Sequence, residues 1–416
     1  INPTRKQSTY NLTMTSPNFL STLTAAILLL ATDSDAYIGV AKPTTKISII
    51  RKQTVDTTTI GSIRVPTVGT GTISWSSDSF FSTENSDVDA VVREAYRSNA
   101  AFFDTAERYG THYKTALGMG YGETERMTSM YLKKAELTEG ASLVNPVVAT
   151  KFTPVPWRTT VQSVVDACEE SCKNLGVDQI DLYQIHMPDI VQPLRAFGKV
   201  ENKDKIYWDG LAECYNRGLV KNVGVCNYGP TLVEKCYDAL AKKGVPLASN
   251  QIGFSLLGRH NGSQETLEKC NKLGVKVLAY YPFAMGLLTG KYSKSSTDED
   301  NSLIQKKKSN MELEDLERYA FGDGESVPEG GIQPLLTTMA AIAQKRKKTV
   351  SQVALNYVIS KGAIPIPGCR TVTQLKDNLG AMRWRLTATE VKMLELESDK
   401  LGFDFDGAGL KRTNEK

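Results

Sequence analysis

Histidine is scarce in this chain, and its cysteines do not have metal-binding spacing. The 416 residues contain 3 histidines and 7 cysteines. Structural zinc sites use four Cys or His ligands that are grouped in short pairs. The closest thiols, Cys168 and Cys172, have the spacing of one helical turn instead. We therefore predict no metal site. An odd number of scattered cysteines favours free thiols and a reducing compartment.

An excess of charge of one sign is also lacking. Lys and Arg number 50 and Asp and Glu number 46, which leaves a net charge of +4 at pH 7. No basic block carries interleaved aromatic residues. Nucleic acid is therefore not an expected partner, and the oligomeric state cannot be read from these features.

The apolar run near the N-terminus, Phe19 to Ala31, is too short to cross a bilayer as a helix. A spanning helix needs about 20 apolar residues. The length suits a secretory signal peptide, and Ser34 and Ala36 are small residues at the positions that a signal peptidase reads. We expect no stable membrane insertion of the mature chain.

Residues 37–55 contain Lys, Arg, Ser and Thr but no acid, which is the composition of a transit peptide. Together with a signal peptide at about residues 14–36, they resemble the two-part leader of plastid proteins that travel through the secretory route. We expect a leader over 1–55, a folded domain over 56–405 and a tail over 406–416. The alternative is a disordered N-terminal tail on a cytoplasmic protein.

From residue 60 onward, short β-branched runs alternate with amphipathic helices. This alternation predicts an α/β protein with a parallel sheet that helices cover. Glycines follow several of the expected helices as stop signals. The expected strands are Val65–Thr72, Ala101–Asp104, Val147–Phe152, Asp181–His186, Asn222–Asn227, Ala248–Gly253, Val275–Tyr281 and Ala363–Pro367. The expected helices include Asp87–Ser98, Thr160–Leu175, Trp208–Arg217, Leu232–Lys242, Glu265–Lys272 and Val350–Ile359.

Eight such units favour a closed (β/α)8 TIM barrel over an open doubly wound sheet. A doubly wound sheet should carry a dinucleotide fingerprint, and residues 69–72 lack its third glycine and its ribose-binding acid. Thr57–Val65 is expected to form a β-hairpin that closes the barrel floor. Two segments exceed usual loop lengths: Thr111–Gly120, and an insertion from Ser293 to about Gly331 after the seventh strand.

The most informative segment is residues 102–110, with the sequence Phe-Phe-Asp-Thr-Ala-Glu-Arg-Tyr-Gly. An apolar run ends there in a carboxylate and a phenol, as expected where a barrel strand meets its catalytic face. The segment resembles the Asp-Thr-Ala-x-x-Tyr-Gly signature of the aldo-keto reductases. The resemblance extends over roughly residues 57–400 and is closest to the plastid branch, which includes pyridoxal reductases.

Four ionisable residues lie at three consecutive expected strand ends. The second strand delivers Asp104 and, in the following loop, Tyr109; the third ends at Lys151 and the fourth at His186. They match the Asp-Tyr-Lys-His tetrad of the family. The resemblance implies NADPH-dependent reduction of a carbonyl, a reaction of an oxidoreductase acting on CH–OH groups.

In this hypothesis each residue type has a physical role. Hydride addition builds negative charge on the carbonyl oxygen, so an acid must supply a proton, and Tyr109 is the expected donor. Lys151 is expected to lower the pKa of Tyr109 by the effect of an opposite charge. Asp104 is expected to hold Lys151, and a neutral His186 to orient the substrate oxygen.

Further segments resemble the family's NADPH site. Amides after the fifth strand and on the sixth are expected to hold the nicotinamide carboxamide, Tyr280 to stack on its ring, and residues 286–291 to contact the pyrophosphate. A helix that opens after Pro367 is expected to receive a phosphate at its N-terminus. The expected cofactor residues are Gly71, Thr72, Asn227, Asn250, Gln251, Tyr280, Pro282, Gly286, Leu288, Gly290, Lys291, Gly368, Arg370, Gln374 and Asn378.

The chain departs from the family pattern at two of these positions. Many relatives have a lysine and an arginine where this chain has Gly368 and Gln374, but Arg370 is available to hold a 2′-phosphate. We therefore expect NADPH/NADP+ rather than NADH. Trp75, Trp157 and Met187 are the expected residues of the pocket for a small-molecule carbonyl substrate.

Three alternatives remain open. The enzyme could be specific for pyridoxal, which the substrate loops decide. The chain could also be a non-catalytic NADPH-binding regulatory subunit, although an intact tetrad speaks against lost activity. The third alternative is a barrel with unrelated chemistry, because a fold does not determine function.

Overall fold

The computed structural model describes residues 55–75, 87–110, 121–139, 145–189, 202–291 and 331–401. All of them belong to one compact unit, Lys52–Lys416. Residues 1–54 of the expected leader, the Thr111–Gly120 segment, nearly all of the 293–331 insertion and the 406–416 tail lie outside the described residues. No helix in the described part of the chain is long and apolar enough to cross a membrane.

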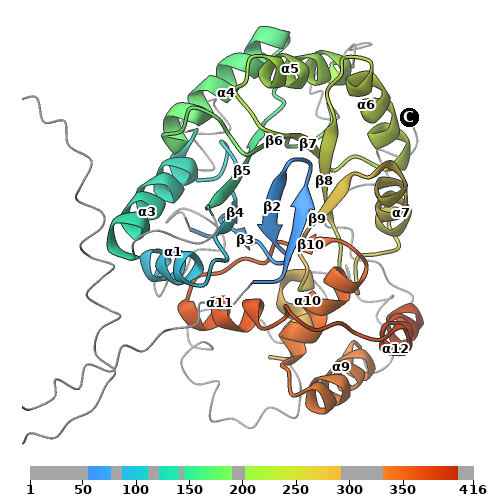
Figure 1. Cartoon of the computed structure of the whole chain (residues 1–416). Helices are drawn as coiled ribbons and strands as arrows, with labels where there is room; N and C mark the ends of the chain where they lie inside the picture. Colours follow the sequence, from blue (N-terminus) through green and yellow to red (C-terminus); the bar gives the residue numbers. More distant parts are fainter. Residues whose placement is uncertain are drawn as a thin grey trace, which may run out of the picture. The chain divides into compact units, whose positions relative to one another are not determined.

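Eight parallel strands follow one another in chain order around a closed barrel (Figure 1). The strands are β3 (Thr70–Gly71), β4 (Phe102–Asp104), β5 (Val147–Phe152), β6 (Leu182–Ile185), β7 (Val223–Cys226), β8 (Leu247–Gly253), β9 (Lys276–Tyr280) and β10 (Ile364–Pro365). The first and last strands meet: Gly69 N donates to Pro365 O at 3.0 Å and Gly71 N to Pro367 O at 2.9 Å. Closure removes both sheet edges and confirms the predicted (β/α)8 barrel.

Helices surround the strands (Figure 1). They are α1 (Val88–Arg97), α3 (Glu123–Glu139), α4 (Val161–Leu175), α5 (Asp204–Asn216), α6 (Pro230–Ala241), α7 (Ser263–Leu273), α9 (Gln333–Arg346), α10 (Val350–Ser360), α11 (Val372–Leu379) and α12 (Ala388–Lys400), with a 3-10 helix η2 (Ala284–Thr289). Local sequence signals set several ends. Thr160 and Ser163 form a capping box at the start of α4, and Gly176 ends it in the left-handed conformation.

A β-hairpin lies across one opening of the barrel (Figure 1). Its strands, β1 (Thr57–Ile60) and β2 (Ile63–Pro66), pair antiparallel, as the sequence predicts. The predicted first barrel strand, Val65–Thr72, is wrong in extent because its first two residues belong to β2. Pro66 cannot donate a ladder hydrogen bond, so the hairpin ends there and the barrel begins only at Thr70.

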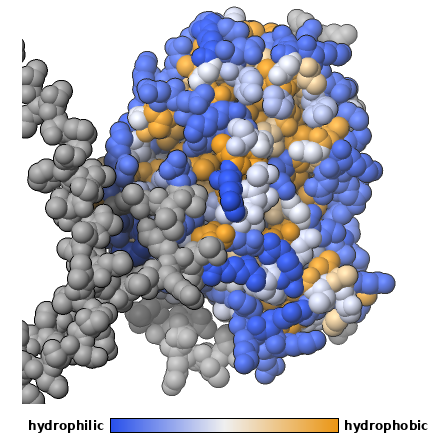
Figure 2. All heavy atoms as spheres, viewed as in Figure 1, coloured by the Kyte–Doolittle hydropathy of each residue, from blue (hydrophilic) through white to orange (hydrophobic). Residues whose placement is uncertain are grey.

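The barrel has an inner and an outer hydrophobic core. Inside, hairpin residues pack against strand residues such as Phe102 and Leu182. Outside, the strands pack against helices α4 to α7, α9, α10 and α12. In the view of Figure 2, hydrophilic side chains cover much of the rim, with hydrophobic residues between them toward the middle of the face.

Helix α3 was not predicted, and its sequence explains why. The side chains that it buries are mostly polar: Thr124, Glu125, Thr128 and Ser129, with Ala135. Glu125 Oε1 accepts a hydrogen bond from Thr150 Oγ1 of the barrel at 2.6 Å, and Ser129 Oγ donates to Leu175 O of α4 at 2.6 Å. The helical spacing of apolar residues that predicts a helix is therefore missing, although the helix packs against α1 and α4.

We predict that Ile60→Ala lowers the free energy of unfolding by about 2–5 kcal/mol, because it leaves a cavity in the barrel floor. Ile60 is 0% exposed and packs inside the barrel. Leu137→Ala on α3 is the control, since Leu137 is 86% exposed and its truncation should cost less than about 0.5 kcal/mol. Urea unfolding measures both values. Equal effects would contradict a hairpin that plugs the barrel.

Candidate active site

The carboxyl ends of all eight barrel strands lie at one end of the barrel, where barrel enzymes carry their catalytic groups. Asp104 is the last residue of β4, and Lys151 is the last residue but one of β5. His186 directly follows β6, and Tyr109 lies in the turn after β4. The structure therefore brings the four expected tetrad residues to one end.

Lys151 is at the centre of this group. Its side chain is 0% exposed, and its ammonium donates to Asp104 Oδ2 at 2.6 Å, Thr105 O at 2.8 Å and Tyr109 OH at 3.1 Å. Three short contacts satisfy the three protons of an ammonium group. A charge buried in this way needs a paired anion, which Asp104 supplies.

Tyr109 and His186 face each other above this ion pair. Their ring centroids are 5.7 Å apart with an interplanar angle of 74°, and both side chains are half-buried. The Nδ1 atom of His186 is buried and has no hydrogen-bond partner among the described residues. A buried polar atom without a partner is typical of a site that receives a ligand group.

The expected low pKa of Tyr109 is not found. Burial raises the pKa of Tyr109 to about 12, although the positive charge of Lys151 acts in the opposite direction. The sign of the Lys151 effect is as expected, but loss of water around the phenol outweighs it. For Lys151, burial opposes the charged form, but the charges of Asp104 and Tyr109 together with the hydrogen bond to Asp104 outweigh it and raise the pKa. Lys151 therefore stays an ammonium and Tyr109 stays a phenol at neutral pH.

His186 is neutral at physiological pH. Burial lowers its pKa well below the usual range, and the positive charges of Lys151 and Arg108 add to the effect. A neutral imidazole carries one N–H and can donate one hydrogen bond without introducing a charge. This is the protonation state that the sequence hypothesis requires.

Two of the expected cofactor amides connect to the tetrad. Gln251 Nε2 donates to Asp104 Oδ1 at 2.8 Å. Asn227 Nδ2 donates to His186 O at 3.0 Å, and Asn227 Oδ1 accepts from Tyr280 OH at 2.7 Å. Hydrogen bonds therefore link the end of β4 to that of β8 and, in a second group, the ends of β6, β7 and β9.

The side chain of Asn250 contacts the helix layer, which does not support its expected role in cofactor binding. Its side-chain amide donates to Tyr228 O at 2.8 Å and contacts Cys270 Sγ at 3.7 Å on helix α7. Successive side chains on a strand point to opposite faces, so Gln251 faces the barrel interior while Asn250 faces the helices. Sequence adjacency alone could not separate the two.

The expected pocket residues have different surroundings. Trp75 is 3% exposed, its indole N–H donates to Cys369 O at 2.9 Å, and its ring packs on Phe103. These contacts make it part of the core beside β4, and its role in the substrate pocket stays a prediction. Trp157 is 58% exposed on the loop after β5, and Met187 is half-buried next to His186.

The segments after β9 and β10 hold the remaining expected cofactor residues. Pro282 is buried, and Leu288 packs its side chain into the outer core, which leaves only backbone for a ligand. Gly290 has φ = 76°, a left-handed conformation that favours glycine. Gly286 lies within η2 with φ = 107°.

Lys291 and Arg370 place two positive charges close together. Desolvation lowers the pKa of Lys291, and the charge of Arg370 lowers it further. Arg370 precedes α11, where Thr371 caps the helix and Gln374 Oε1 accepts a hydrogen bond from Arg370 N at 2.9 Å. Two cations that repel each other form a favourable place for an anion.

The other expected residues of this region lie around that site. Gly368 is exposed, and a Cβ atom there would meet only Ser74 Oγ at 3.8 Å. Gly71 bridges to Gly368, and Thr72 Oγ1 donates to Asp104 O at 3.1 Å. Asn378 is buried on α11.

The structure also brings together residues that the sequence did not single out. Thr105 O is the third acceptor for Lys151. Glu107, two residues before Tyr109, forms a buried ion pair with Arg158 from the loop after β5, at 2.5 Å. Glu107 could have been noticed in the sequence as a charged residue inside the signature segment, but nothing in the sequence indicated its partner Arg158.

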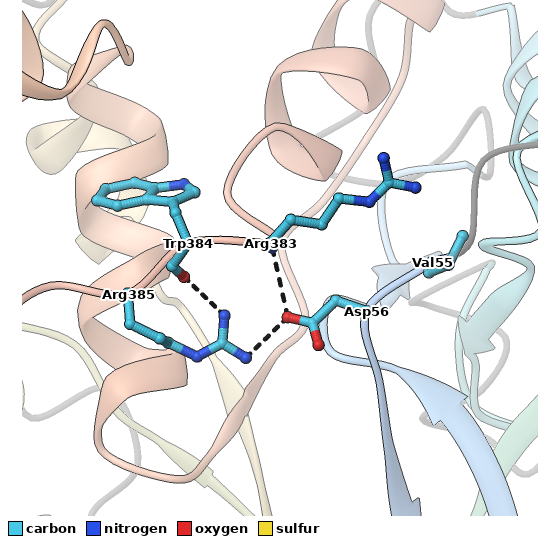
Figure 3. A pocket seen from close by; sticks show the side chains of 5 residues that line it. All are labelled: Val55, Asp56, Arg383, Trp384 and Arg385. Atoms are coloured by element: carbon cyan, nitrogen blue, oxygen red, sulfur yellow. Dashed lines mark hydrogen bonds and ion pairs between the residues drawn. The ribbon is translucent and has the colours of Figure 1, made fainter.

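A surface cavity of about 520 Å³ lies away from the tetrad and is lined by Val55, Asp56, Arg383, Trp384 and Arg385. Figure 3 shows Asp56 between the backbone of Arg383 and the guanidinium of Arg385. Asp56 directly precedes the hairpin that covers the barrel floor, so the cavity is at the end opposite the tetrad.

The sequence model of the Aldo/keto reductase family matches residues 67–396. The chain belongs to this family. The resemblance drawn from the signature segment is therefore confirmed.

Relatives and solved structures agree with this membership. A chloroplastic pyridoxal reductase of Arabidopsis thaliana is 35% identical over 342 residues, which cover 81% of this chain and 84% of the relative. An uncharacterized oxidoreductase of Mycobacterium bovis is 31% identical over 301 residues, covering 72% of this family member and 77% of the relative. The fold matches that of a Bombyx mori aldo-keto reductase in complex with NADP, with a TM-score of 0.59 at 21% identity. The match covers 84% of this chain and 98% of the Bombyx mori chain.

We predict that Asp104→Asn destabilises the protein strongly, because it leaves the Lys151 ammonium buried without its anion. Loss of one partner of a buried pair costs about 3–5 kcal/mol. Glu213→Gln is the matched control, since its partner Arg217 is 43% exposed and such surface pairs contribute at most about 1 kcal/mol. Chemical unfolding at pH 7 measures both. A cost for Asp104→Asn no larger than the control would contradict the buried ion pair.

Proposed function

We propose that this protein reduces an aldehyde or ketone to the corresponding alcohol with NADPH, and that Tyr109 is the proton donor. The observation that carries the proposal is the contact of Lys151 with both Asp104 and Tyr109 at the barrel mouth, beside His186. Family membership supports the same chemistry.

Tyr109 is suited to hold a proton until a strong base forms beside it. Its raised pKa keeps the phenol protonated at neutral pH. When the carbonyl oxygen becomes an alkoxide, the phenol is the stronger acid of the two and transfers its proton. Lys151 then lies 3.1 Å from the phenolate oxygen that remains. Opposite charges about 4 Å apart attract by about 4 kcal/mol at an effective dielectric of 20.

His186 is proposed to orient the substrate. Its neutral ring lies beside Tyr109, so an N–H from one side and the phenol from the other can bind one carbonyl oxygen. Such fixed donors stabilise the charge that develops on that oxygen. Met187 and the exposed Trp157 are the proposed substrate-facing residues.

The chain's own residues fit a dinucleotide phosphate. Lys291 and Arg370 gather positive charge beside the capped start of α11, and Gly368 leaves open space next to it. The 2′-phosphate distinguishes NADPH from NADH, and Arg370 is our proposed contact for it. Bound at this mouth, NADPH supplies the hydride. The solved Bombyx mori relative is in complex with NADP, which supports this choice.

Pyridoxal is the substrate alternative that a specific observation favours. The relative that is 35% identical is a pyridoxal reductase. Its chloroplast location and the leader-like composition of residues 14–55 also support a plastid location for this chain. The proposed organisation remains a leader over 1–55, a barrel domain over 56–405 and a tail over 406–416.

We predict that Tyr109→Phe lowers turnover of 4-nitrobenzaldehyde with NADPH by about 10²–10⁴-fold, which is the range for loss of a general acid. NADPH affinity should be almost unchanged, because the ring remains in place. NADPH oxidation gives the turnover, and a carbonyl panel that includes pyridoxal compares substrates. If wild type and Tyr109→Phe are equally inactive on every carbonyl while both bind NADPH, the non-catalytic binding subunit is the correct reading.

We predict that Arg370→Ala weakens NADPH binding by about tenfold or more and leaves NADH binding nearly unchanged, because charge-assisted contacts to a phosphate contribute about 1.5–3 kcal/mol. Quenching of protein fluorescence measures both dissociation constants. Arg383→Ala, on the cavity at the barrel floor, is the control and should alter neither constant. An equal loss for NADPH and NADH would contradict a 2′-phosphate contact.

A further inference from the structure

We propose that Glu107 and Arg158 form a positioning pair that holds the turn carrying Tyr109 against the strand end carrying Lys151. This inference rests on the proposed role of Tyr109 as proton donor. It assigns a role to a buried ion pair outside the tetrad. The pair connects the turn after β4, which carries Tyr109, to the loop that follows β5, the strand that carries Lys151.

Glu107 ties the Tyr109 turn to its neighbours through both backbone and side chain. Its backbone N–H donates to Lys151 O at 3.4 Å, and its backbone carbonyl accepts from Gly122 N at 2.7 Å. Its carboxylate accepts from Thr153 N at 2.5 Å. One residue between Asp104 and Tyr109 is therefore bonded to the end of β5 and to the start of α3.

Arg158 completes the connection from the other loop. Its guanidinium donates to both carboxylate oxygens of Glu107, at 2.5 Å and 3.1 Å, and to Thr153 O at 3.1 Å. It also lies over the rings of Phe152 and Tyr121, at 4.9 Å and 5.2 Å from the centroids. A two-pronged contact between planar groups fixes orientation as well as distance.

Both charges are withdrawn from water, which makes the pair rigid. The side chains of Arg158 and Glu107 are 15% and 5% exposed. Tyr207 OH donates to Arg158 O at 3.0 Å, so the backbone that carries the guanidinium is itself held. A pair on the surface would exchange with water and transmit little positional constraint.

Tyr109 depends on this constraint because its own described contacts are few. Its backbone N–H makes a turn hydrogen bond to Ala106 O at 3.1 Å, its hydroxyl accepts from Lys151, and its ring contacts that of His186. The contacts to Lys151 and His186 hold only the end of the side chain, whereas Glu107 holds the backbone of the turn against β5. A misplacement of reacting groups by about 1 Å can cost about 10²-fold in rate.

The test uses Arg158→Ala, Arg158→Lys and Glu107→Gln in the full chain. We expect Arg158→Ala and Glu107→Gln to lower kcat for a carbonyl by about tenfold or more, with the Kd for NADPH changed by less than about twofold. Arg158→Lys keeps the charge but makes a single contact, so its kcat should fall between those of wild type and Arg158→Ala.

A second measurement follows Tyr109 without any turnover. With [13Cζ]tyrosine, the Tyr109 resonance is identified by its loss in Tyr109→Phe, and its chemical shift is followed against pH. Burial holds the pKa of Tyr109 at about 12 in the wild type. A released turn exposes the phenol, so in Arg158→Ala we expect this pKa to fall toward the unperturbed value of about 10.

The matched control is Arg346→Ala, which breaks another two-pronged Arg–carboxylate contact remote from the site. Arg346 donates to Glu390 at 2.9 Å and 2.6 Å, between helices α9 and α12. The Arg346→Ala substitution should lower the melting temperature but leave kcat and the pKa of Tyr109 unchanged. This separates positioning from a general loss of stability.

Two results would overturn the positioning role. One is a folded Arg158→Ala variant in which the pKa of Tyr109 equals that of the wild type. The other is a kcat for Arg158→Ala that falls no further than that of the Arg346→Ala control. If Glu107→Gln does not fold, Arg158→Lys and Arg158→Ala carry the test. If the wild type reduces no carbonyl, the proposed function fails, and the Tyr109 titration still decides whether the pair holds the turn.

Discussion

A buried ammonium must have an anion beside it, and much of the active end of this barrel is arranged around that requirement. Lys151 is fully buried and finds Asp104 at 2.6 Å. The other oxygen of Asp104 accepts from Gln251 Nε2, and the remaining Lys151 protons reach Thr105 O and Tyr109 OH. One ion pair thus fixes groups from three strands, because each unmet hydrogen bond here would be costly.

The same burial sets the protonation states. Exclusion of water keeps Tyr109 a phenol and His186 an uncharged imidazole, while the Asp104 charge keeps Lys151 an ammonium. A site with these states has two neutral donors over a fixed cation, which suits an oxygen that becomes negative during reaction. In the proposed mechanism the ammonium acts mainly after the proton has moved, by stabilising the phenolate, rather than by acidifying the free phenol.

The barrel supplies the rigidity that such a site needs. Closure between Gly71 and Gly368 leaves no free edge, and the hairpin fills the floor with Ile60, Ile63 and Val65. The loops at the other end can therefore differ in sequence without loss of the barrel. The two cations proposed to bind the cofactor, Lys291 and Arg370, lie on two such loops, about 80 residues apart in the chain. Family membership and the local geometry point to the same end of the molecule.

The sequence by itself determined the family, the order of eight strands and the four residue types at their ends, because strand periodicity and the signature segment are local features. Only the tertiary structure decided which side of β8 Asn250 faces, that Trp75 is core, and that burial outweighs Lys151 in setting the pKa of Tyr109. It also joined Glu107 to Arg158, 51 residues away. The direction in which a side chain points, its burial and its pairing with a distant residue depend on how separate segments pack. No local pattern in the sequence encodes that packing.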